Sequence, residues 1–218
     1  MKADFLRQGG LYAITSVSSA CTVASVLEDV TSLLEGGCQL LQYRDKISSS
    51  ARQQSLARQL LELCQQSNCT LLINDDWQLA ARIGAPGVHL GQGDGNVGDA
   101  RAALGSEAII GVTCHDQLTL AQKAEQEGAD YVAFGAFYPS RSKPEAKPAP
   151  LSLLSEARQL IHLPVVAIGG ITLDRAPELW QAGADWVAVI QDLFAAENIG
   201  EKASAYATQH QLHRRISR

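Results

Sequence analysis

The chain alternates between two patterns of apolar residues. Short apolar runs, such as residues 11–15, are typical of buried strands. Longer segments follow them, in which apolar residues recur at the i, i+3, i+4 and i+7 spacing of an amphipathic helix, as Val23, Val26, Leu27 and Val30 do. Gly36-Gly37 stops the first of these helical segments. The pattern therefore predicts a repeated strand–helix unit.

This unit recurs along the whole chain. We predict eight strands, over residues 11–15, 39–43, 71–73, 88–90, 109–113, 131–135, 165–168 and 186–190. We predict helices over residues 23–34, 51–64, 77–83, 97–104, 117–127, 151–160 and 173–181, with a helical tail over about residues 192–209. Three helix-to-strand transitions, at residues 84–89, 128–133 and 183–188, begin with Gly-Ala and continue into an apolar strand.

Eight strands that alternate with helices predict an α/β protein with a single (β/α)8 TIM barrel. We assign the whole chain, residues 1–218, to this one domain, with a core at about residues 11–195 and a helical C-terminal tail. A doubly wound open sheet is the alternative. It would usually have fewer strands, and no G-x-G-x-x-G sequence follows the first strand here.

Composition excludes several classes of protein. The 218 residues are 46% hydrophobic and 19% charged, with a net charge of −5, so no general basic field favours nucleic acid. The N-terminal sequence is too polar for a signal peptide, and no apolar run approaches membrane-spanning length. The five cysteines are odd in number and form no C-x-x-C pair. We therefore expect free thiols and a cytoplasmic protein, without a membrane or nucleic-acid partner.

Carboxylates follow two consecutive predicted strands. Asp75 and Asp76 come after residues 71–73, and Asp94 comes after residues 88–90. Because the strands of a βαβ unit are parallel, Asp75 and Asp94 should stand at the same rim. Carboxylate oxygens suit Mg²⁺, which completes its coordination with water and phosphate. A helix cap and a turn explain the same residues, and the two explanations are compatible if Asp76 is the cap.

In a barrel all eight strand ends face one rim, so the residues after each strand form the candidate site. They are Gln42, Arg44, Lys46, Asn74, Asp75, Gln92, Asp94, Thr113, His115, residues 140–143, Gly169, Gly170, Ile190 and Gln191. The loops after the second, third and fourth strands carry cations beside carboxylates, which suits a diphosphate with Mg²⁺. Paired glycines after the seventh strand suit a phosphate. Each group also has a structural alternative. Arg44 and Lys46 would be solvated surface charges, residues 140–143 a flexible polar loop, and Gly169-Gly170 a tight turn. We interpret His89, inside a strand, as a core or hydrogen-bonded residue.

Five segments together resemble the motifs of one enzyme family. They are residues 42–46 (Gln-Tyr-Arg-Asp-Lys), 72–76 (Leu-Ile-Asn-Asp-Asp), 89–94 (His-Leu-Gly-Gln-Gly-Asp), 130–135 (Asp-Tyr-Val-Ala-Phe-Gly) and 167–171 (Ala-Ile-Gly-Gly-Ile). They resemble thiamine-phosphate synthase, in the order of that family and at barrel spacing. The resemblance extends from about Leu11 to Ile190.

The resemblance implies a transferase of thiamine biosynthesis. Such an enzyme joins a hydroxymethylpyrimidine diphosphate to a thiazole phosphate, or to its carboxylated form with loss of CO₂, and releases thiamine phosphate and pyrophosphate. It implies a dissociative mechanism, Mg²⁺ as cofactor, and a possible homodimer. The implied contacts to the pyrimidine diphosphate come from Gln42, Tyr43, Arg44, Asp45, Lys46, Asn74, Thr113 and Lys143. The implied ligands of Mg²⁺ are Asp75 and Asp94, and the implied contacts to the thiazole phosphate are Ser140, Arg141, Ser142, Gly170, Ile190 and Gln191.

The sequence departs from the family pattern mainly on the thiazole-phosphate side. Residues 140–143 read Ser-Arg-Ser-Lys instead of Thr-x-Thr-Lys, Pro150 replaces a glycine, and Gln191 replaces a serine. Thr113 replaces a serine and keeps the hydroxyl. One alternative function is that of a relative with the same fold, a thiazole tautomerase, which has no need for the diphosphate and Mg²⁺ residues. Another is a non-catalytic phosphate-binding barrel.

Overall fold

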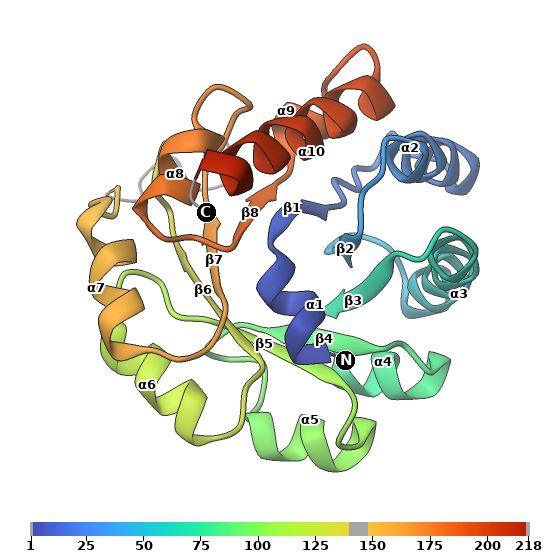
Figure 1. Cartoon of the computed structure of the whole chain (residues 1–218). Helices are drawn as coiled ribbons and strands as arrows, with labels where there is room; N and C mark the ends of the chain where they lie inside the picture. Colours follow the sequence, from blue (N-terminus) through green and yellow to red (C-terminus); the bar gives the residue numbers. More distant parts are fainter. Residues whose placement is uncertain (1, 140–147, 217–218) are drawn as a thin grey trace.

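The computed structural model of the chain describes residues 2–139 and 148–216. Eight parallel strands pair in sequence order, and β8 returns to pair with β1, so the sheet closes into a barrel (Figure 1). The strands are β1 (Gly10–Ile14), β2 (Leu40–Tyr43), β3 (Thr70–Asn74), β4 (Gly87–Leu90), β5 (Ile109–Thr113), β6 (Tyr131–Gly135), β7 (Val165–Ile168) and β8 (Trp186–Val189). The predicted (β/α)8 TIM barrel is confirmed.

Helices surround the barrel, and each of the eight strands is followed by at least one helix (Figure 1). They are α1 (Lys2–Gln8), α2 (Val23–Glu35), α3 (Ser50–Gln66), α4 (Trp77–Ile83), α5 (Val97–Leu104), α6 (Leu118–Gln126), α7 (Ser152–Leu160), α8 (Ala176–Ala182), α9 (Gln191–Phe194) and α10 (Ile199–Ile216). None of these described helices has the length and apolar character needed to cross a membrane.

Two helix predictions need correction, and one further helix was not predicted. The predicted continuous tail is two helices, α9 and α10, which residues 195–198 separate. The helix predicted from residue 173 begins at Ala176, because residues 172–175 form a turn in which the Arg175 N–H donates to the Thr172 carbonyl. The helix that was not predicted is α1. This short, mostly polar helix lies across the N-terminal end of the barrel, where Leu6 is buried and the Leu6 carbonyl accepts a hydrogen bond from the Trp186 indole.

Alternate residues of each strand form two separate apolar layers. Leu11 and Ala13 of β1 point outward and pack with the helices, whereas Tyr12 and Ile14 point inward with Leu72, Tyr131 and Trp186. One strand glycine serves the inner layer. A Cβ atom at Gly111 would stand 1.9 Å from the Tyr131 ring, so this position must lack a side chain for the ring to cross the barrel.

The repeated Gly-Ala-Asp sequence makes the same contacts at two places. Asp130 accepts a 2.8 Å hydrogen bond from the Ile110 backbone and pairs with Arg101 of α5 at 2.6 Å. Asp185 accepts a 2.7 Å bond from the Val165 backbone and pairs with Arg158 of α7 at 2.6 Å. Each aspartate therefore ties a helix to the start of a strand.

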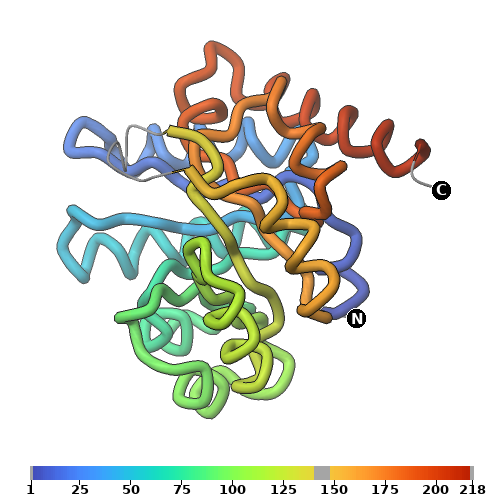
Figure 2. Tube along the Cα trace, turned by 90° about the vertical axis from the view of Figure 1, so that its left-hand side faces the viewer, coloured from blue at the N-terminus to red at the C-terminus, as the bar shows by residue number. Residues whose placement is uncertain are grey.

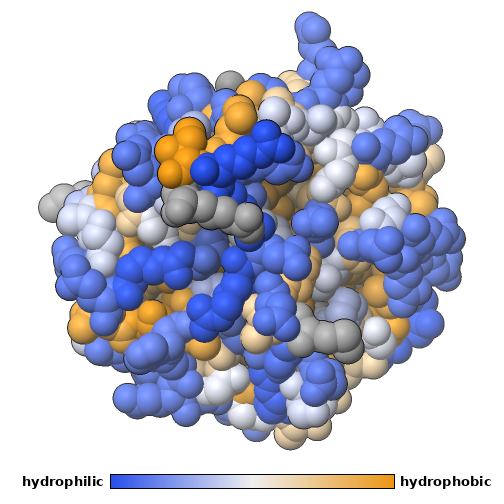
Figure 3. Space-filling view, in the orientation of Figure 1, coloured by the Kyte–Doolittle hydropathy of each residue, from blue (hydrophilic) through white to orange (hydrophobic). Residues whose placement is uncertain are grey.

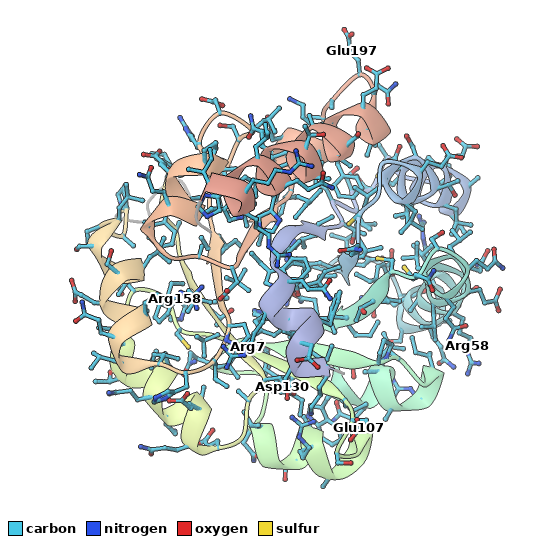
Figure 4. The ribbon with its side chains drawn as sticks, in the orientation of Figure 1. Arg7, Arg58, Glu107, Asp130, Arg158 and Glu197 are labelled. Atoms are coloured by element: carbon cyan, nitrogen blue, oxygen red, sulfur yellow. The ribbon has the colours of Figure 1, made fainter. Side chains whose placement is uncertain are left out.

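These two aspartates belong to the end of the barrel where α1 lies. Lys2 of α1 adds a second ion pair to Asp130, at 2.9 Å. Figure 4 shows Asp130 and Arg158 on this face, which is the one toward the viewer. In the space-filling view of the same face, hydrophilic side chains cover most of the surface around α1 (Figure 3).

Candidate active site

The opposite end of the barrel carries the residues that follow the strands. In Figure 2 the N-terminus lies on the right, and the loops after the strands point to the left. Because all strands are parallel, every predicted site residue in the described ranges belongs to this rim or to the strand ends just below it. Residues 140–143, predicted to contribute Ser140, Arg141, Ser142 and Lys143, lie outside the described residues.

Asp75 and Asp94 stand side by side at this rim, as the βαβ argument predicted. Their carboxyl groups are within hydrogen-bonding reach of each other, and the Lys46 ammonium contacts Asp75. Burial raises the pKa of the Asp94 carboxyl, and the neighbouring Asp75 raises it further, while the Gly91 N–H and Lys46 act in the opposite direction. Two adjacent carboxylates, one of which raises the pKa of the other, form a site that favours a cation.

The local backbone directs Asp75 into the site. Asp75 has a φ of 65°, and its N–H donates to the His89 carbonyl of β4 at 2.8 Å. A non-glycine residue in this region is uncommon, and aspartate is among the side chains that tolerate it. The next residue, Asp76, accepts a 2.7 Å hydrogen bond from the Leu79 N–H and caps α4. Asp76 is therefore the cap, and Asp75 is left free for the rim.

The loop after β2 is held by its own side chains. The Asp45 carboxylate accepts hydrogen bonds from the backbones of Ile47 and Ser48 and from the Tyr43 hydroxyl, each at 3.0 Å. Burial opposes the ionisation of Asp45, but the Ser48 side chain and these hydrogen bonds lower its pKa overall. Tyr43 itself packs in the outer apolar layer. Direct substrate contacts by Tyr43 and Asp45 stay a prediction, and their visible contacts shape the loop.

Thr15 is a supporting residue that the sequence analysis did not propose. It is buried at the end of β1, where its hydroxyl accepts a hydrogen bond from the Arg44 N–H at 2.8 Å and donates to the Arg44 carbonyl at 3.0 Å. The Arg44 guanidinium makes no hydrogen bond or ion pair with another described residue. Arg44 therefore has a fixed backbone and an available cationic head beside Lys46.

A chain of hydrogen bonds crosses the interior of the barrel beneath the rim. Gln42 Nε2 donates to the Tyr12 hydroxyl at 2.6 Å, and the Tyr12 and Tyr131 hydroxyls are 2.9 Å apart. Tyr131 then meets His89 Nδ1 at 2.8 Å, and His89 Nε2 meets the Thr113 hydroxyl at 2.8 Å. The interpretation of His89 as a hydrogen-bonded core residue is confirmed.

Burial fixes the protonation states within this chain. It lowers the pKa of His89 to about 4 and raises the pKa values of Tyr12 and Tyr131, so all three groups are neutral at pH 7. With a neutral imidazole, one arrangement satisfies every member, in which each group donates to the next from Gln42 to Thr113. This arrangement leaves the Gln42 carboxamide oxygen and the Thr113 O–H available to a ligand.

The loop after β7 forms the other side of the rim. Gly169 and Gly170 have φ values of 105° and 59°, and a Cβ atom at Gly170 would stand 2.4 Å from the Pro139 carbonyl oxygen. Only glycine suits this combination of conformation and close approach. Neither the Gly170 nor the Ile171 N–H has a hydrogen-bond partner among the described residues. Ile190 is half-buried and precedes α9, and Gln191 begins that helix and is exposed.

Two further residues of this region were not proposed from sequence. Tyr138, after β6, donates its backbone N–H to the Gly169 carbonyl at 3.1 Å, and Arg175 donates to the Gly170 carbonyl at 2.8 Å. The Arg175 guanidinium also lies over the Tyr138 ring, 4.7 Å from its centroid. Neither residue follows its strand directly, so neither belongs to the strand-end pattern that predicts the site.

The described residues could hold a metal ion only in an open site. No group of three or more His, Cys, Asp or Glu side chains in the described ranges is arranged to bind a metal. The Asp75–Asp94 pair supplies two carboxylates, which matches an ion that keeps water and substrate oxygens in its coordination sphere. The pair therefore suits an ion that keeps part of its coordination sphere open better than an ion enclosed by protein ligands.

Comparisons with known proteins agree with this geometry. The family model described as thiamine monophosphate synthase matches residues 11–193. The chain is 50% identical over 198 residues to the thiamine-phosphate synthase of Azoarcus sp. (strain BH72), covering 91% of this chain and 95% of that protein. It is 47% identical over 210 residues to the thiamine-phosphate synthase of Thioalkalivibrio sulfidiphilus (strain HL-EbGR7), covering 94% and 97%.

A solved structure shows the same likeness in three dimensions. The thiamine phosphate pyrophosphorylase from Pyrococcus furiosus superimposes with a TM-score of 0.85 at 28% identity, covering 96% of this chain and 98% of that one. The resemblance inferred from five short motifs and the predicted enzyme class, a transferase of thiamine biosynthesis, are confirmed. With a model match over most of its length and relatives near 50% identity, the chain belongs to the thiamine monophosphate synthase family.

Proposed function

We propose that the protein joins 4-amino-2-methyl-5-hydroxymethylpyrimidine diphosphate to hydroxyethylthiazole phosphate and releases thiamine phosphate and pyrophosphate. With the carboxylated thiazole phosphate, the reaction also releases CO₂. Family membership supports the reaction class. The single observation that carries the assignment to this site is the adjacent carboxylate pair, Asp75 and Asp94, beside Lys46.

The diphosphate belongs at the ends of β2 to β4. Lys46 and the available Arg44 guanidinium supply positive charge there, and Asn74 ends the strand that precedes Asp75. Asp75 and Asp94 would hold Mg²⁺, which supplies charge stabilisation to the departing pyrophosphate. Arg44 and Lys46 act on the same developing negative charge. Lys143, outside the described residues, is proposed as a third cation.

The buried hydrogen-bond chain supports a place for the pyrimidine ring. The Gln42 carboxamide oxygen accepts hydrogen bonds and the Thr113 hydroxyl donates them, which complements the amino group and a ring nitrogen of an aminopyrimidine. His89 contacts Thr113, but its lowered pKa makes it a weak base, so this pair is not an activated nucleophile. The site therefore binds and orients a heterocycle without attacking it.

These features suit a dissociative substitution. The bond between the pyrimidine methylene carbon and the diphosphate oxygen breaks first, and its electron pair leaves with pyrophosphate. The thiazole nitrogen then gives its lone pair to the methylene carbocation, which the electron-rich pyrimidine stabilises. The protein supplies charge stabilisation and holds the two substrates in contact, and it forms no covalent bond.

The thiazole phosphate belongs at the loops after β6, β7 and β8. The N–H groups of Gly170 and Ile171 are available there, next to Ile190 and Gln191. Ser140, Arg141 and Ser142 are proposed to complete this site from outside the described residues. The preferred thiazole phosphate, a homodimeric state and a cytoplasmic location stay predictions.

The tautomerase alternative explains less of the site. Isomerisation of a thiazole carboxylate needs neither a diphosphate nor a metal, yet Arg44, Lys46, Asp75 and Asp94 converge at one rim. A non-catalytic phosphate-binding barrel would likewise leave the carboxylate pair without a role. Release of pyrophosphate that depends on Mg²⁺ separates the proposed function from both alternatives.

The test compares two neighbouring carboxylates. Purified protein is mixed with the pyrimidine diphosphate, the thiazole phosphate and Mg²⁺, and pyrophosphate and thiamine phosphate are followed together. Asp75→Asn should lose most turnover, because it removes a metal ligand, and asparagine tolerates the positive φ at this position. Asp76→Asn is the matched control, since asparagine also caps helices, and it should keep wild-type turnover.

Each outcome has a distinct meaning. Formation of both products that requires Mg²⁺ and is lost only in Asp75→Asn supports the proposal. Equal activity of Asp75→Asn and the wild type refutes the metal assignment. If the wild type releases pyrophosphate without forming thiamine phosphate, the acceptor is wrong. If neither product forms, the proposed reaction is wrong.

A further inference from the structure

Two residues from different loops hold the Gly169–Gly170 turn through hydrogen bonds to its two carbonyl groups. The Tyr138 N–H, after β6, donates to the Gly169 carbonyl at 3.1 Å, and the Arg175 guanidinium, just before α8, donates to the Gly170 carbonyl at 2.8 Å. The carbonyls of two successive peptide groups are therefore fixed in direction. Both bonds come from described residues that the proposed reaction does not otherwise use.

Fixing these carbonyls also fixes two donors. A peptide group is planar and trans, so its N–H points opposite to its C=O. The bond from Tyr138 to the Gly169 carbonyl thus turns the Gly170 N–H away from Tyr138. The bond from Arg175 to the Gly170 carbonyl turns the Ile171 N–H away from Arg175. These two N–H groups have no hydrogen-bond partner among the described residues.

Besides the Gly170 carbonyl, Arg175 contacts the ring of Tyr138. Its guanidinium lies 4.7 Å from the centroid of the Tyr138 ring, a distance typical of a cation–π contact. The Tyr138 hydroxyl in turn contacts the Glu178 carboxylate of α8. Burial and the neighbouring Glu178 raise the pKa of Tyr138, so the hydroxyl stays protonated and donates to that carboxylate. The turn, Tyr138, Arg175 and Glu178 therefore form one connected brace.

We propose that Arg175, together with the Tyr138 ring, is a positioning residue for the phosphate of the thiazole substrate. It acts through the Gly170 carbonyl, by orienting the Ile171 N–H toward the anion. This inference rests on the proposed function of the same loop as the thiazole-phosphate site. It assigns the affinity of that site partly to a side chain that follows the glycine pair by five residues.

Arginine suits this role better than lysine does. Its planar group can donate to a carbonyl and present a face to an aromatic ring at the same time, which a compact ammonium cannot do. Arg175→Lys should therefore restore only part of the effect of Arg175→Ala. A residue that acted merely as a positive charge near the phosphate would be replaced well by lysine.

The test separates the two substrates. In steady-state kinetics, Arg175→Ala should raise the KM for the thiazole phosphate roughly tenfold, because one oriented hydrogen bond is lost. The KM for the pyrimidine diphosphate and the kcat at saturation should stay within about twofold of wild type. Tyr138→Leu should show the same pattern, whereas Tyr138→Phe keeps the ring and should stay close to wild type. Arg58→Ala, which removes an exposed arginine of α3, is the matched control (Figure 4).

A binding measurement keeps this inference distinct from the proposed reaction. Calorimetric titration of the thiazole phosphate into each variant, without pyrimidine diphosphate, should show the same tenfold loss for Arg175→Ala, with an unchanged melting temperature of the barrel as the control for folding. Weaker binding in Arg175→Ala supports the inference even if the wild type forms no thiamine phosphate. The inference is overturned if a wild type that forms thiamine phosphate keeps its affinity in Arg175→Ala, if both KM values rise together, or if the wild type binds no thiazole phosphate.

Discussion

At the end of the barrel covered by α1, Asp130 and Asp185 each face an arginine and a backbone N–H. At the opposite rim, Asp75 and Asp94 face each other, and Lys46 contacts Asp75. The first pair of carboxylates has its hydrogen-bonding needs met within the protein. The second pair is left with a mutual repulsion that a bound cation would relieve. The same residue type thus stabilises the fold at one end and prepares a ligand site at the other.

The difference between these two pairs of carboxylates shows how the partners of a charged side chain can indicate a ligand site. A paired aspartate at a strand start gains from folding, because its partners hold it in place. The contact between Asp75 and Asp94 instead raises the pKa of Asp94, which opposes its ionisation, so their juxtaposition points to a cationic ligand. This contrast does not depend on the identity of the substrate.

The largest effect should come from Asp94→Asn. This change removes a proposed metal ligand, so kcat/KM should fall by roughly 10²–10³ in the thiamine phosphate assay. Without metal, the variant should be at least as resistant to urea as the wild type, because the repulsion with Asp75 is gone. A clear loss of stability together with full activity would reverse the roles that we assign to the two ends.

Protonation of His89, in the middle of the barrel, should lower the free energy of unfolding in acid. His89 has a pKa of about 4 in the folded protein, below its ordinary value near 6.5, so the unfolded chain binds the proton more readily between these values. Its contribution is intact above pH 6.5 and is lost as the pH falls toward 4, by up to about 3 kcal/mol.

Urea unfolding of the wild type and His89→Gln between pH 7.5 and 4 measures this contribution. The variant should show a smaller decrease of unfolding free energy with falling pH. His162→Gln is the control, because that side chain is 91% exposed. Parallel curves for His89→Gln and the wild type would rule out His89 as the cause.

A smaller effect should follow at the end covered by α1. Asp185→Asn weakens the contact with Arg158 and should reduce the free energy of unfolding by about 2 kcal/mol, because the carboxylate is 11% exposed and also serves the Val165 N–H. The kinetic constants of the folded variant should remain those of the wild type. Altered KM values at full stability would show that the two ends are coupled.

The smallest effect should come from Asp76→Ala. This change removes the cap of α4 and should cost about 1 kcal/mol in urea unfolding. Turnover should persist, even though the residue adjoins Asp75. Loss of Mg²⁺-dependent activity at unchanged stability would place Asp76, rather than Asp75, in the metal site.

The sequence determined the arrangement of strands well, because each buried strand is a short apolar run between polar or glycine-rich segments. The same regularity predicts that Asp75 and Asp94 lie at one rim. Helix α1 was not predicted, since its two large apolar residues, Phe5 and Leu6, are adjacent and give no helical period. The break between α9 and α10 was missed as well, because residues 195–198 hold neither proline nor glycine.

Residues that hold other residues in position could not be predicted from the sequence either. Thr15 and Arg175 hold the backbones of other residues, and Tyr12 and Tyr131 meet across the barrel from strands far apart in sequence. Such contacts depend on the directions of side chains in three dimensions, which a strand-end rule does not contain. Tyr43 shows the same limit, because its position beside Arg44 did not reveal that it packs in the outer layer.

The chain of hydrogen bonds from Gln42 to Thr113 links the ligand-facing groups of β2 and β5. A row of groups that each donate to the next has a polarity, and a turn of the Gln42 amide would oblige the hydroxyls and the imidazole to reverse in concert. The hydrogen-bond chain therefore has one direction in this structure, and the orientation of the Gln42 amide at β2 is linked to the direction of the Thr113 hydroxyl at β5.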